Sequence, residues 1–446
     1  MERRFFTGLK NKKIIKEMAG ITPIISTDTR TIKEGDFYLP IKGENFDGEK
    51  FIENAISAGA IGFLTTNEAT AEKYKNDSRV QLIAVVPNTL TAYMEFAQAH
   101  IEKKGFKVVG ITGSSGKTTT KEMVSAVLSE KFRIHKTAKN HNNEIGFCQT
   151  VFNAPEDTQI LILEMGMRGL GEIELIAKYA KPDIAIITNV GTAHIGRLGS
   201  RENIAIAKCE IAKYLKENGI FIAQNDELTK KTVSFTGKKV FYSVDNVKNI
   251  EQSVGLSKFT YQDNIFELPI EGKHNIENAL AAINVGQFLG EDFEQIKAGL
   301  LKFQQIENRW NIEKTNHFTI INDAYNANPE SMKATIDTVL NMYSDIVLIL
   351  GDMGELGENA KEYHSQIGEF INSHHKIKQS TLVITVGELA SNIGSQLSSC
   401  STLHFKNNED VSNYILKNKN IGNILFFKGS RSMRLEEIIK TIKGDF

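Results

Sequence analysis

Short hydrophobic runs alternate with amphipathic stretches along most of this chain. Between about residues 104 and 307, apolar runs occupy 160–163, 184–187 and 220–223, and stretches of helical periodicity separate them. Strands of this kind that alternate with helices are typical of a largely parallel sheet covered by helices. The pattern predicts an α/β fold for this segment.

The same alternation begins again after Arg309. Strands are predicted there at 318–322, 346–350, 382–386, 402–405 and 423–427, with helices between them. Before residue 104 the chain has shorter strands and helices and ends in an amphipathic helix near 90–103. We therefore predict three α/β domains, a smaller one at 1–103, a central one at 104–307 and a Rossmann-like one at 308–446.

Composition agrees with this organisation and limits the partners. The 446 residues are too many for one core, and 53 Lys and Arg nearly balance 54 Asp and Glu. The net charge therefore gives no reason to expect binding to nucleic acid or to an anionic membrane. The three cysteines are far apart and no run approaches 18 apolar residues, so we expect a cytoplasmic protein without disulfides or membrane insertion. We also expect a monomer.

A glycine-rich turn joins the apolar strand at 108–112 to the start of a helix. Gly113 and Gly116 let the backbone bend so that successive N–H groups and the helix N-terminus point at phosphate oxygens. Lys117 would reach the β- and γ-phosphates, and the Thr118 hydroxyl would complete a magnesium shell. The segment predicts a site for MgATP or MgGTP.

This turn departs from the general phosphate-loop motif at one position. The motif G-x-x-x-x-G-K-[ST] requires glycine at position 111, where this chain has Ile111. The strand–turn–helix context still supports nucleotide binding. The predicted phosphate contacts are Gly113, Ser114, Ser115, Gly116, Lys117, Thr118 and Thr119.

Polar residues follow two other predicted strands of the central sheet. Glu164 ends the run 160–163, where a carboxylate could bind magnesium or be a solvated strand-end acid. A polar loop at 188–194 follows the run 184–187. Its His194 is a candidate metal ligand or phosphate contact, or else a structural histidine.

Three further segments are ambiguous by residue type alone. Lys208 lies in a segment with helical spacing of its apolar residues, and by itself it is expected to be one more solvated lysine. The amides at 140–143 could cap a helix or bind a ligand, and the polar groups at 272–278 could form a helix start or a ligand site. Asp323 follows a strand and could hold a ribose or an amine, while Pro329 begins the next helix.

Together these segments resemble the Mur ligase family, the ATP-dependent enzymes that extend the peptide of bacterial cell-wall precursors. The resemblance runs from about residue 26 to 435. Thr112-Gly-Ser-Ser-Gly-Lys-Thr118 is similar to the family's phosphate loop, whose pattern T-G-x-x-G-K-T accounts for Ile111.

The resemblance implies roles for residues around ATP and magnesium. ATP would be bound by the phosphate loop together with His274, Asn275, Asn278, Arg309 and Asp323. Two magnesium ions would be held by Thr118, Glu164, His194 and Lys208, the last carbamylated by CO2. Lys117, Lys208, His194 and Arg309 would lie at the reacting groups, and the C-terminal domain would close over ATP and bind the incoming dipeptide.

Within the family, some segments are similar to the member that joins D-alanyl-D-alanine to UDP-N-acetylmuramoyl-tripeptide through an acyl phosphate. These segments are 325–329, 350–357 and 428–431. The segment 26–30, with 42–43 and 46–48, is similar to the uridine-nucleotide domain that the last two ligases of the pathway share, and the D-N-P-R motif of the ligase that adds a diamino acid is absent. The resemblance implies that these two small molecules are the substrates. Their predicted contacts are Thr27, Asp28, Thr29, Arg30, Lys42, Asn142, Asn143, Tyr325, Asn326, Asn328 and Lys428.

Three other functions stay open at this point. A related ligase would act on folate or add a different amino acid. A phosphate-loop GTPase would need an Asn-Lys-x-Asp guanine motif, and the sequence has none. A catalytically silent nucleotide-binding protein would bind ATP without forming ADP.

Overall fold

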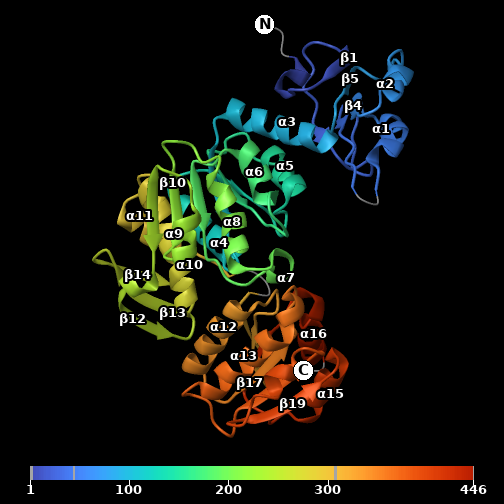
Figure 1. Cartoon of the computed structure of the whole chain (residues 1–446). Helices are drawn as coiled ribbons and strands as arrows, with labels where there is room; N and C mark the ends of the chain where they lie inside the picture. The colour runs from blue at the N-terminus through green and yellow to red at the C-terminus, as the bar shows by residue number, and fades with distance from the viewer. Residues whose placement is uncertain (1–3, 44–45, 306–308, 445–446) are drawn as a thin grey trace. The chain divides into compact units, whose positions relative to one another are not determined.

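The computed structural model describes residues 4–43, 46–305 and 309–444. The chain divides into two compact units (Figure 1). The first, here called the N-terminal unit, contains Met1–Lys107, Thr137–Leu161 and Lys178–Ala180, and the second unit contains the remainder. The two units are described separately.

The N-terminal unit is built on a five-stranded sheet in the order β1-β5-β4-β3-β2. The pairs β2–β3, β3–β4 and β4–β5 are parallel, and β1 is antiparallel to β5. A buried cluster that includes Tyr38, Ile52, Phe63 and Ile83 fills one face. The strands are β1 Lys13–Glu17, β2 Ile25–Ser26, β3 Phe37–Tyr38, β4 Gly62–Thr65 and β5 Leu82–Val85, and the helices are α1 Ile52–Ser57, α2 Glu68–Tyr74, α3 Thr89–Lys104 and α5 Glu144–Phe152.

Helix α3 confirms the amphipathic helix predicted near 90–103. Asn88 caps its N-terminus through a side chain that accepts from the Thr91 N–H, and Gly105 ends it in the left-handed region at φ 69°. The helix therefore begins and ends at residues whose chemistry favours helix termini.

A six-stranded sheet in the order β11-β10-β9-β6-β8-β7 contains the strand that leads into the phosphate loop. The pairs β6–β9, β9–β10 and β10–β11 are parallel, which confirms the predicted architecture. The inner strands β6, β8, β9 and β10 are buried on both faces over most of their length, and this is why they contain continuous apolar runs. The strands are β6 Lys107–Thr112, β7 Ile134–Lys136, β8 Ile160–Glu164, β9 Ile184–Ile187, β10 Ile220–Gln224 and β11 Lys238–Tyr242.

Helices cover this sheet and carry several site residues. Helix α10 packs against α4, the helix that begins at Lys117. The helices are α4 Lys117–Leu128, α6 Glu172–Ala180, α7 Ile195–Leu198, α8 Arg201–Cys209, α9 Glu227–Thr232, α10 Lys273–Phe288 and α11 Phe293–Leu301. The turn between β6 and α4 is thus the strand–turn–helix unit expected from the sequence.

A three-stranded antiparallel sheet interrupts the predicted alternation. Strands β12 Lys248–Ser253, β13 Leu256–Tyr261 and β14 Asn264–Leu268 pair in that order. Only alternate side chains of β13 and β14, such as Phe259 and Phe266, are buried. Their half-polar pattern lacks the apolar runs on which the strand prediction relied.

The last sheet has the order β15-β16-β20-β17-β18-β19 and confirms the five strands predicted after Arg309. Its edge strand β15 Asn311–Lys314 is antiparallel to β16 and was not predicted. The other strands are β16 Thr319–Asn322, β17 Ile346–Gly351, β18 Leu382–Val386, β19 Ser401–Phe405 and β20 Ile424–Lys428, and the helices are α12 Pro329–Met342, α13 Ala360–Ser373, α14 Ser391–Gly394, α15 Asn408–Lys417 and α16 Glu436–Gly444.

One face of this sheet packs against α15 and α16. Alternate strand residues such as Val347, Ile349 and Phe427 form a single buried cluster with Ile415 and Ile438 from these helices. In Figure 1, α12 and α13 lie on the other side of the strands from α15 and α16. Helices therefore cover both faces of a mostly parallel sheet, as in doubly wound folds.

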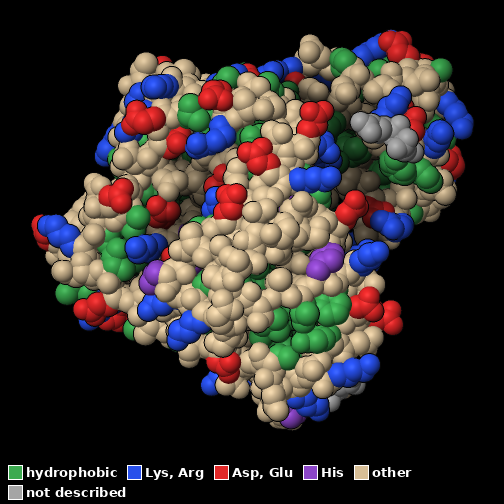
Figure 2. Space-filling view, turned by 60° about the horizontal axis from the view of Figure 1, so that its bottom comes forward, with side chains coloured by type: hydrophobic (Ala, Val, Ile, Leu, Met, Phe, Trp, Pro, Cys, Tyr) green, Lys and Arg blue, Asp and Glu red, His purple; other side chains and the backbone are tan. Residues whose placement is uncertain are grey.

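The surface carries charges of both signs. Figure 2 shows Lys and Arg side chains interspersed with Asp and Glu over one face, in keeping with the nearly neutral net charge of −1. Within the described ranges, no helix is both long enough and apolar enough to cross a membrane. Cys148, Cys209 and Cys400 are buried free thiols.

Candidate active site

The turn between β6 and α4 has the backbone geometry that a phosphate loop needs. Gly113 has φ +153° and Gly116 has φ +75°, values that L side chains rarely adopt. A Cβ at Gly113 would lie 1.8 Å from Thr188 Oγ1. The Lys117 ammonium donates back to the Gly113 carbonyl oxygen at 2.7 Å, which places the cation over the turn.

The end of strand β9 holds this turn from one side. Asn189 accepts from the Ser115 N–H at 3.0 Å and donates to Ser115 Oγ at 2.9 Å. Thr188 Oγ1 donates to the Ser115 carbonyl oxygen at 2.5 Å, and Ser114 Oγ accepts from the Gly191 N–H at 2.9 Å. These bonds fix the turn before any nucleotide arrives.

Helix α10 brings its amides to the other end of the turn. Thr120 Oγ1 donates to Asn278 Oδ1 at 3.1 Å, and a Cβ at Gly116 would lie 2.5 Å from the same oxygen. Asn275 donates to the Glu271 carbonyl oxygen at 2.7 Å. The helix begins after Gly272 without a side-chain cap, so the polar groups at 272–278 are not a capped helix start.

Glu164 and Lys121 form a buried pair below the phosphate loop. Glu164 ends β8 and is 5% exposed, so it is not a solvated acid. The Lys121 ammonium, 2% exposed, lies 3.7 Å from Glu164 Oε2 and 3.4 Å from Glu122 Oε1. Burial lowers the pKa of the neighbouring Lys117, and the Glu164 charge opposes that shift.

Lys208 is buried inside the protein rather than solvated. It lies in the last turn of α8 and is 1% exposed. Burial lowers the pKa of its ammonium well below the ordinary value, and the Lys117 charge acts in the same direction. The structure therefore favours a neutral amine at this position, which the helical spacing gave no reason to expect.

His194 ends the loop between β9 and α7 and is paired with Glu355. The residue has a left-handed backbone at φ 67°, and its Nδ1 lies 2.5 Å from Glu355 Oε2. This contact lowers the pKa of the Glu355 carboxyl, and Arg197 and Arg168 contribute to the same shift. Sequence analysis assigned no role to Glu355, although it lies in the segment 350–357 that resembles the family.

The donor groups around the phosphate loop suit magnesium. Thr118 and Glu164 supply a hydroxyl and a carboxylate, which are oxygen donors that magnesium prefers, whereas the imidazole nitrogen of His194 is a donor more typical of softer metals. In the described part of the chain, no three His, Cys, Asp or Glu side chains gather into a cluster of their own. A complete shell would therefore need further donors, such as phosphate oxygens and a modified Lys208.

The segment after β16 contributes a second group of predicted residues. Lys428 Nζ lies 2.5 Å from Asp323 Oδ2 and donates to the Asn326 carbonyl oxygen at 3.3 Å. Asn328 caps α12, whose first residue is Pro329 as predicted, and its amide donates to the Ser114 carbonyl oxygen at 3.4 Å. This bond links the α12 N-terminus to the phosphate loop.

Aromatic rings contact two further residues that are predicted to bind the nucleotide. The Arg309 guanidinium lies 4.1 Å from the centre of the Tyr325 ring. The His274 ring packs edge-on against Trp310, and burial lowers the pKa of His274 to about 4. Across the described ranges, the buried His274 Nδ1 has no hydrogen-bond partner.

The N-terminal unit contains the other predicted substrate residues. Arg30 Nη2 lies 2.6 Å from Asp28 Oδ2, and hydrogen bonds from Arg30 lower the pKa of that carboxyl to about 2. Lys42 is exposed and forms a backbone bridge to Asp47. Thr27 and Thr29, on either side of Asp28, are half-buried.

Asn142 and Asn143, the two predicted substrate contacts in the amide segment of this unit, differ in that Asn143 has a structural role. Asn143 caps α5 by accepting from the Gly146 N–H at 2.9 Å, which confirms the capping alternative. The Asn142 backbone N–H donates to the Asn140 carbonyl oxygen at 2.8 Å. Contacts of either amide with a substrate stay a prediction.

Sequence reasoning missed several residues that shape the site. These residue types are common on protein surfaces. Only the fold brings the residues to the phosphate loop or to the loop that contains His194. The polar run 188–194 was the one available signal, and it covered the first two of them. The missed residues are Thr188, Asn189, Lys121, Glu330 and Glu355.

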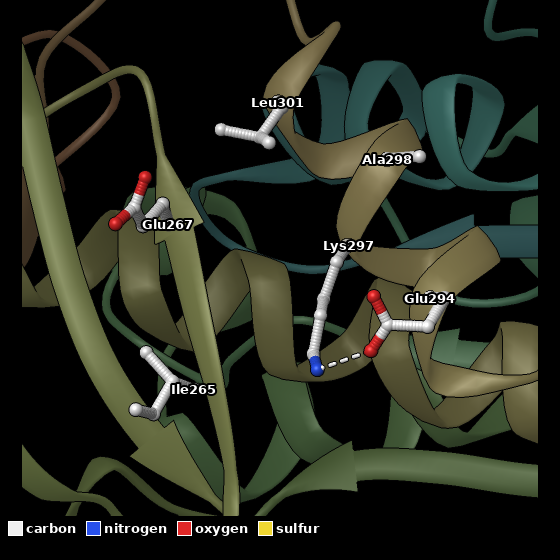
Figure 3. Close-up of a pocket in the computed structure, with 6 residues that line it drawn as sticks. All are labelled: Ile265, Glu267, Glu294, Lys297, Ala298 and Leu301. Carbon is white, nitrogen blue, oxygen red and sulfur yellow. Dashed lines mark hydrogen bonds and ion pairs between the residues drawn. The ribbon is translucent and has the colours of Figure 1, made fainter.

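A separate hollow of about 300 Å³ lies between β14 and α11. Figure 3 shows Ile265 and Leu301 on its walls and the ion pair of Lys297 with Glu294, whose atoms are 2.6 Å apart. None of its lining residues belongs to the predicted site.

The fold and the loop geometry define a nucleotide-binding α/β protein with a phosphate loop at the carboxyl end of a parallel sheet. Three family models match it: the Mur ligase family catalytic domain at residues 23–111, the Mur ligase middle domain at 111–286 and the Mur ligase glutamate ligase domain at 308–431. The chain belongs to the Mur ligase family, whose members are ATP-dependent ligases.

Individual relatives agree over nearly the whole length. The chain is 39% identical to the UDP-N-acetylmuramoyl-tripeptide–D-alanyl-D-alanine ligase of Bacillus subtilis over 94% of this chain and 92% of that one. It is 28% identical to MurF of Acinetobacter baumannii, with a TM-score of 0.85 and coverage of 94% and 93%. MurF of Thermotoga maritima in complex with ADP gives a TM-score of 0.84, 28% identity and coverage of 95% and 98%.

Proposed function

We propose that this protein joins D-alanyl-D-alanine to the terminal carboxylate of UDP-N-acetylmuramoyl-tripeptide and converts ATP to ADP and phosphate. The observation that carries the proposal is the 39% identity with the Bacillus subtilis ligase over 94% of the chain. The preformed phosphate loop supports the ATP requirement. Asp28, Arg30 and Lys42 are the proposed uridine-nucleotide contacts.

The reaction requires activation because a carboxylate is a poor acylating agent. A carboxylate oxygen attacks the γ-phosphorus of ATP, the bond to the β-phosphate oxygen breaks, and ADP leaves. The dipeptide amine then attacks the acyl carbon, loses a proton and expels phosphate. No side chain is assigned as the general base.

The chain's own residues would hold the reacting groups in line. Lys117, above the Gly113 carbonyl, lies where a cation can neutralise the γ-phosphate, and Arg309 supplies a second cation. Thr118, Glu164 and His194 would bind the two magnesium ions, which screen the repulsion between phosphates and carboxylate. His274, Asn275 and Asn278 are proposed contacts of adenine and ribose, and Asp323 is a further proposed nucleotide contact. Its partner Lys428 is a proposed substrate contact.

We further propose that Lys208 is carbamylated. Only a neutral amine attacks CO2, and burial of Lys208 favours that form. The N–C bond forms, one proton leaves to solvent, and the product is a carboxylate that can ligate the second magnesium ion. The modification turns a buried amine, which carries no negative charge, into an anionic ligand.

Domain boundaries at 103 and 307 are also part of the proposal. The residues after 308 would bind the incoming dipeptide through Tyr325, Asn326 and Asn328 and would close over ATP. Closure would exclude water and protect the acyl phosphate from hydrolysis.

Phosphate release by the purified protein tests the proposal directly. With ATP, magnesium and UDP-N-acetylmuramoyl-tripeptide, we expect release when D-alanyl-D-alanine is added and none with diaminopimelate or L-glutamate. Activity only with glutamate and a folate would instead identify a related ligase. ATP binding without ADP formation in the presence of both substrates would identify a silent nucleotide-binding protein.

A further inference from the structure

The turn after strand β17 packs against helix α7 through backbone atoms. The Gly196 N–H donates to the Glu355 carbonyl oxygen at 3.0 Å. A Cβ at Gly196 would lie 2.4 Å from the Gly357 nitrogen, and a Cβ at Gly357 would lie 2.7 Å from the Gly196 Cα. Neither position has room for a side chain. We call this close approach of Gly196 and Gly357 the glycine contact, and it joins the last sheet to the helix that follows the loop containing His194.

The turn at 352–357 has an unusual backbone where it makes this contact. Glu355 and Gly357 have φ values of 62° and 67°, in the left-handed region. Few residues other than glycine adopt this region, and such a conformation persists only where neighbouring contacts impose it. One end of the turn is anchored by the Ser430 N–H, which donates to the Asp352 carbonyl oxygen at 2.9 Å. The shape of the turn therefore depends on hydrogen bonds from outside it.

His364, in helix α13, fixes the turn next to this anchor. The residue is 0% exposed, and its Nε2 accepts from the Met353 N–H at 2.9 Å. Its Nδ1 lies 2.6 Å from the carbonyl oxygen of Ala360, the first residue of the same helix. Because a backbone N–H only donates and a carbonyl oxygen only accepts, Nε2 carries no proton and Nδ1 carries one. Burial lowers the pKa of the ring and favours this neutral form, although the bond to Ala360 and the Asp352 charge oppose the shift.

We propose that His364 is a positioning residue, which as a neutral ring holds the turn 352–357 in the shape that the glycine contact requires. The inference rests on the proposed function, which gives the residues after 308 the dipeptide site. That site must stay beside the phosphate loop while the amine attacks the acyl phosphate. The glycine contact helps to hold the two together, so loss of His364 lowers the rate of transfer and leaves nucleotide binding unchanged.

Hydrogen exchange of the Gly196 amide in the ADP complex of the full chain tests the structural step. This N–H donates across the glycine contact, so slow exchange reports that the contact is formed. His364→Leu leaves the buried Met353 N–H without its acceptor and should speed the exchange about tenfold. His364→Gln, whose amide oxygen can accept from that N–H, should speed it less. Equal protection in His364→Leu and the wild type overturns the proposal.

A control variant shows whether the effect is specific to this ring. His375→Leu replaces an exposed histidine just after the same helix and should leave the exchange of the Gly196 amide unchanged. If His375→Leu speeds the exchange as much as His364→Leu does, the effect does not come from the bond to Met353 and the proposal fails.

Gly196→Ala tests the contact from its other side. Gly196 lies in α7 without a positive φ, so alanine suits its own backbone, and the nearest obstacles are Gly357 and the Glu355 carbonyl oxygen. Because a displacement of about 1 Å can cost about a hundredfold in rate, we expect Gly196→Ala and His364→Leu each to lower kcat by about tenfold to a hundredfold. The ADP affinity should not change. Gly169→Ala, where the nearest atom would lie 3.8 Å from the added Cβ, should keep the full kcat.

The double variant separates positioning from a general loss of stability. If both substitutions act through the glycine contact, Gly196→Ala with His364→Leu should be no slower than the slower single variant. Effects that multiply, or a loss of ADP affinity in His364→Leu, overturn the proposal. A wild-type protein that releases no phosphate with D-alanyl-D-alanine would refute the proposed function instead, and the exchange of the Gly196 amide would still decide the role of His364.

Discussion

Asn189 holds Ser115 of the phosphate loop through both ends of its side-chain amide, with bonds of 3.0 Å to the Ser115 nitrogen and 2.9 Å to Ser115 Oγ. The residue contacts the loop from the end of the neighbouring strand β9, so the sheet itself presets the phosphate-binding turn. A preset turn costs less ordering when nucleotide binds.

Asn189→Ala should therefore weaken ADP binding while the fold stays intact. We expect an affinity loss of about tenfold, equivalent to about 1.4 kcal/mol. Titration calorimetry with ADP measures it, and Asn153→Ala, at an exposed asparagine, serves as the control. Equal affinity in Asn189→Ala and the wild type would show that the amide does not preorganise the turn.

Gly113→Ala should abolish nucleotide binding for a steric reason. The added Cβ would lie 1.8 Å from Thr188 Oγ1 at a φ of +153°, so the turn must change shape. Gly171→Ala is the matched control, because Gly171 also has a positive φ, of +86°, but faces open space. The measurement is ADP affinity together with the thermal unfolding temperature. Retained affinity in Gly113→Ala would mean that the turn does not bind phosphate in this shape.

Lys208→Ala should eliminate turnover, and added CO2 should not restore it, because the variant has no amine to carbamylate. Incubation of the wild type with 13C-bicarbonate should give a carbamate carbon resonance that the variant lacks. Lys213→Ala, at a lysine with a 46% exposed side chain, should keep both the resonance and the activity. Near-normal activity of Lys208→Ala would remove the carbamate from the mechanism.

Glu291 should make stability depend on pH. Its side chain is 6% exposed and, throughout the described ranges, neither carboxyl oxygen has a hydrogen-bond partner. Burial raises its pKa from 4.5 to about 7. The folded state therefore binds the proton more tightly than the unfolded chain, and this contribution to stability is lost as pH rises from 4.5 through 7.

Glu291→Gln should accordingly be most stabilising, relative to wild type, at pH 8. We expect a difference of about 1–3 kcal/mol at pH 8 that shrinks towards pH 5. Urea unfolding at both pH values measures it, with Glu294→Gln, at an exposed neighbour, as the control. A difference that does not change with pH would contradict the buried, protonated carboxyl.

The sequence predicted most strands of the two six-stranded sheets because parallel strands are buried on both faces and appear as apolar runs, as β8 and β17 do. The edge strands β7, β11 and β15 were not predicted. Strands β12–β14 were missed because only alternate residues are buried. Glu164 could be placed at the site because it ends an apolar strand. The burial of Glu164 could not be predicted from the sequence, because it depends on the packing of the folded chain.

Other site properties depend on contacts between distant parts of the chain. No local pattern shows that Lys208 is 1% exposed or that Glu355 lies beside His194. Helical spacing made Lys208 look like a surface lysine, and only packing around α8 removes it from water. Only the resemblance to a family singled out Lys208 before the structure did, and nothing singled out Glu355.

The transfer of an isotope label tests the central claim most directly. In a reaction with ATP, D-alanyl-D-alanine and tripeptide carrying 18O in its terminal carboxylate, one labelled oxygen should appear in the released phosphate for each pentapeptide formed, because the acyl phosphate breaks at its acyl carbon. Unlabelled phosphate, or AMP and pyrophosphate in place of ADP and phosphate, would contradict the account.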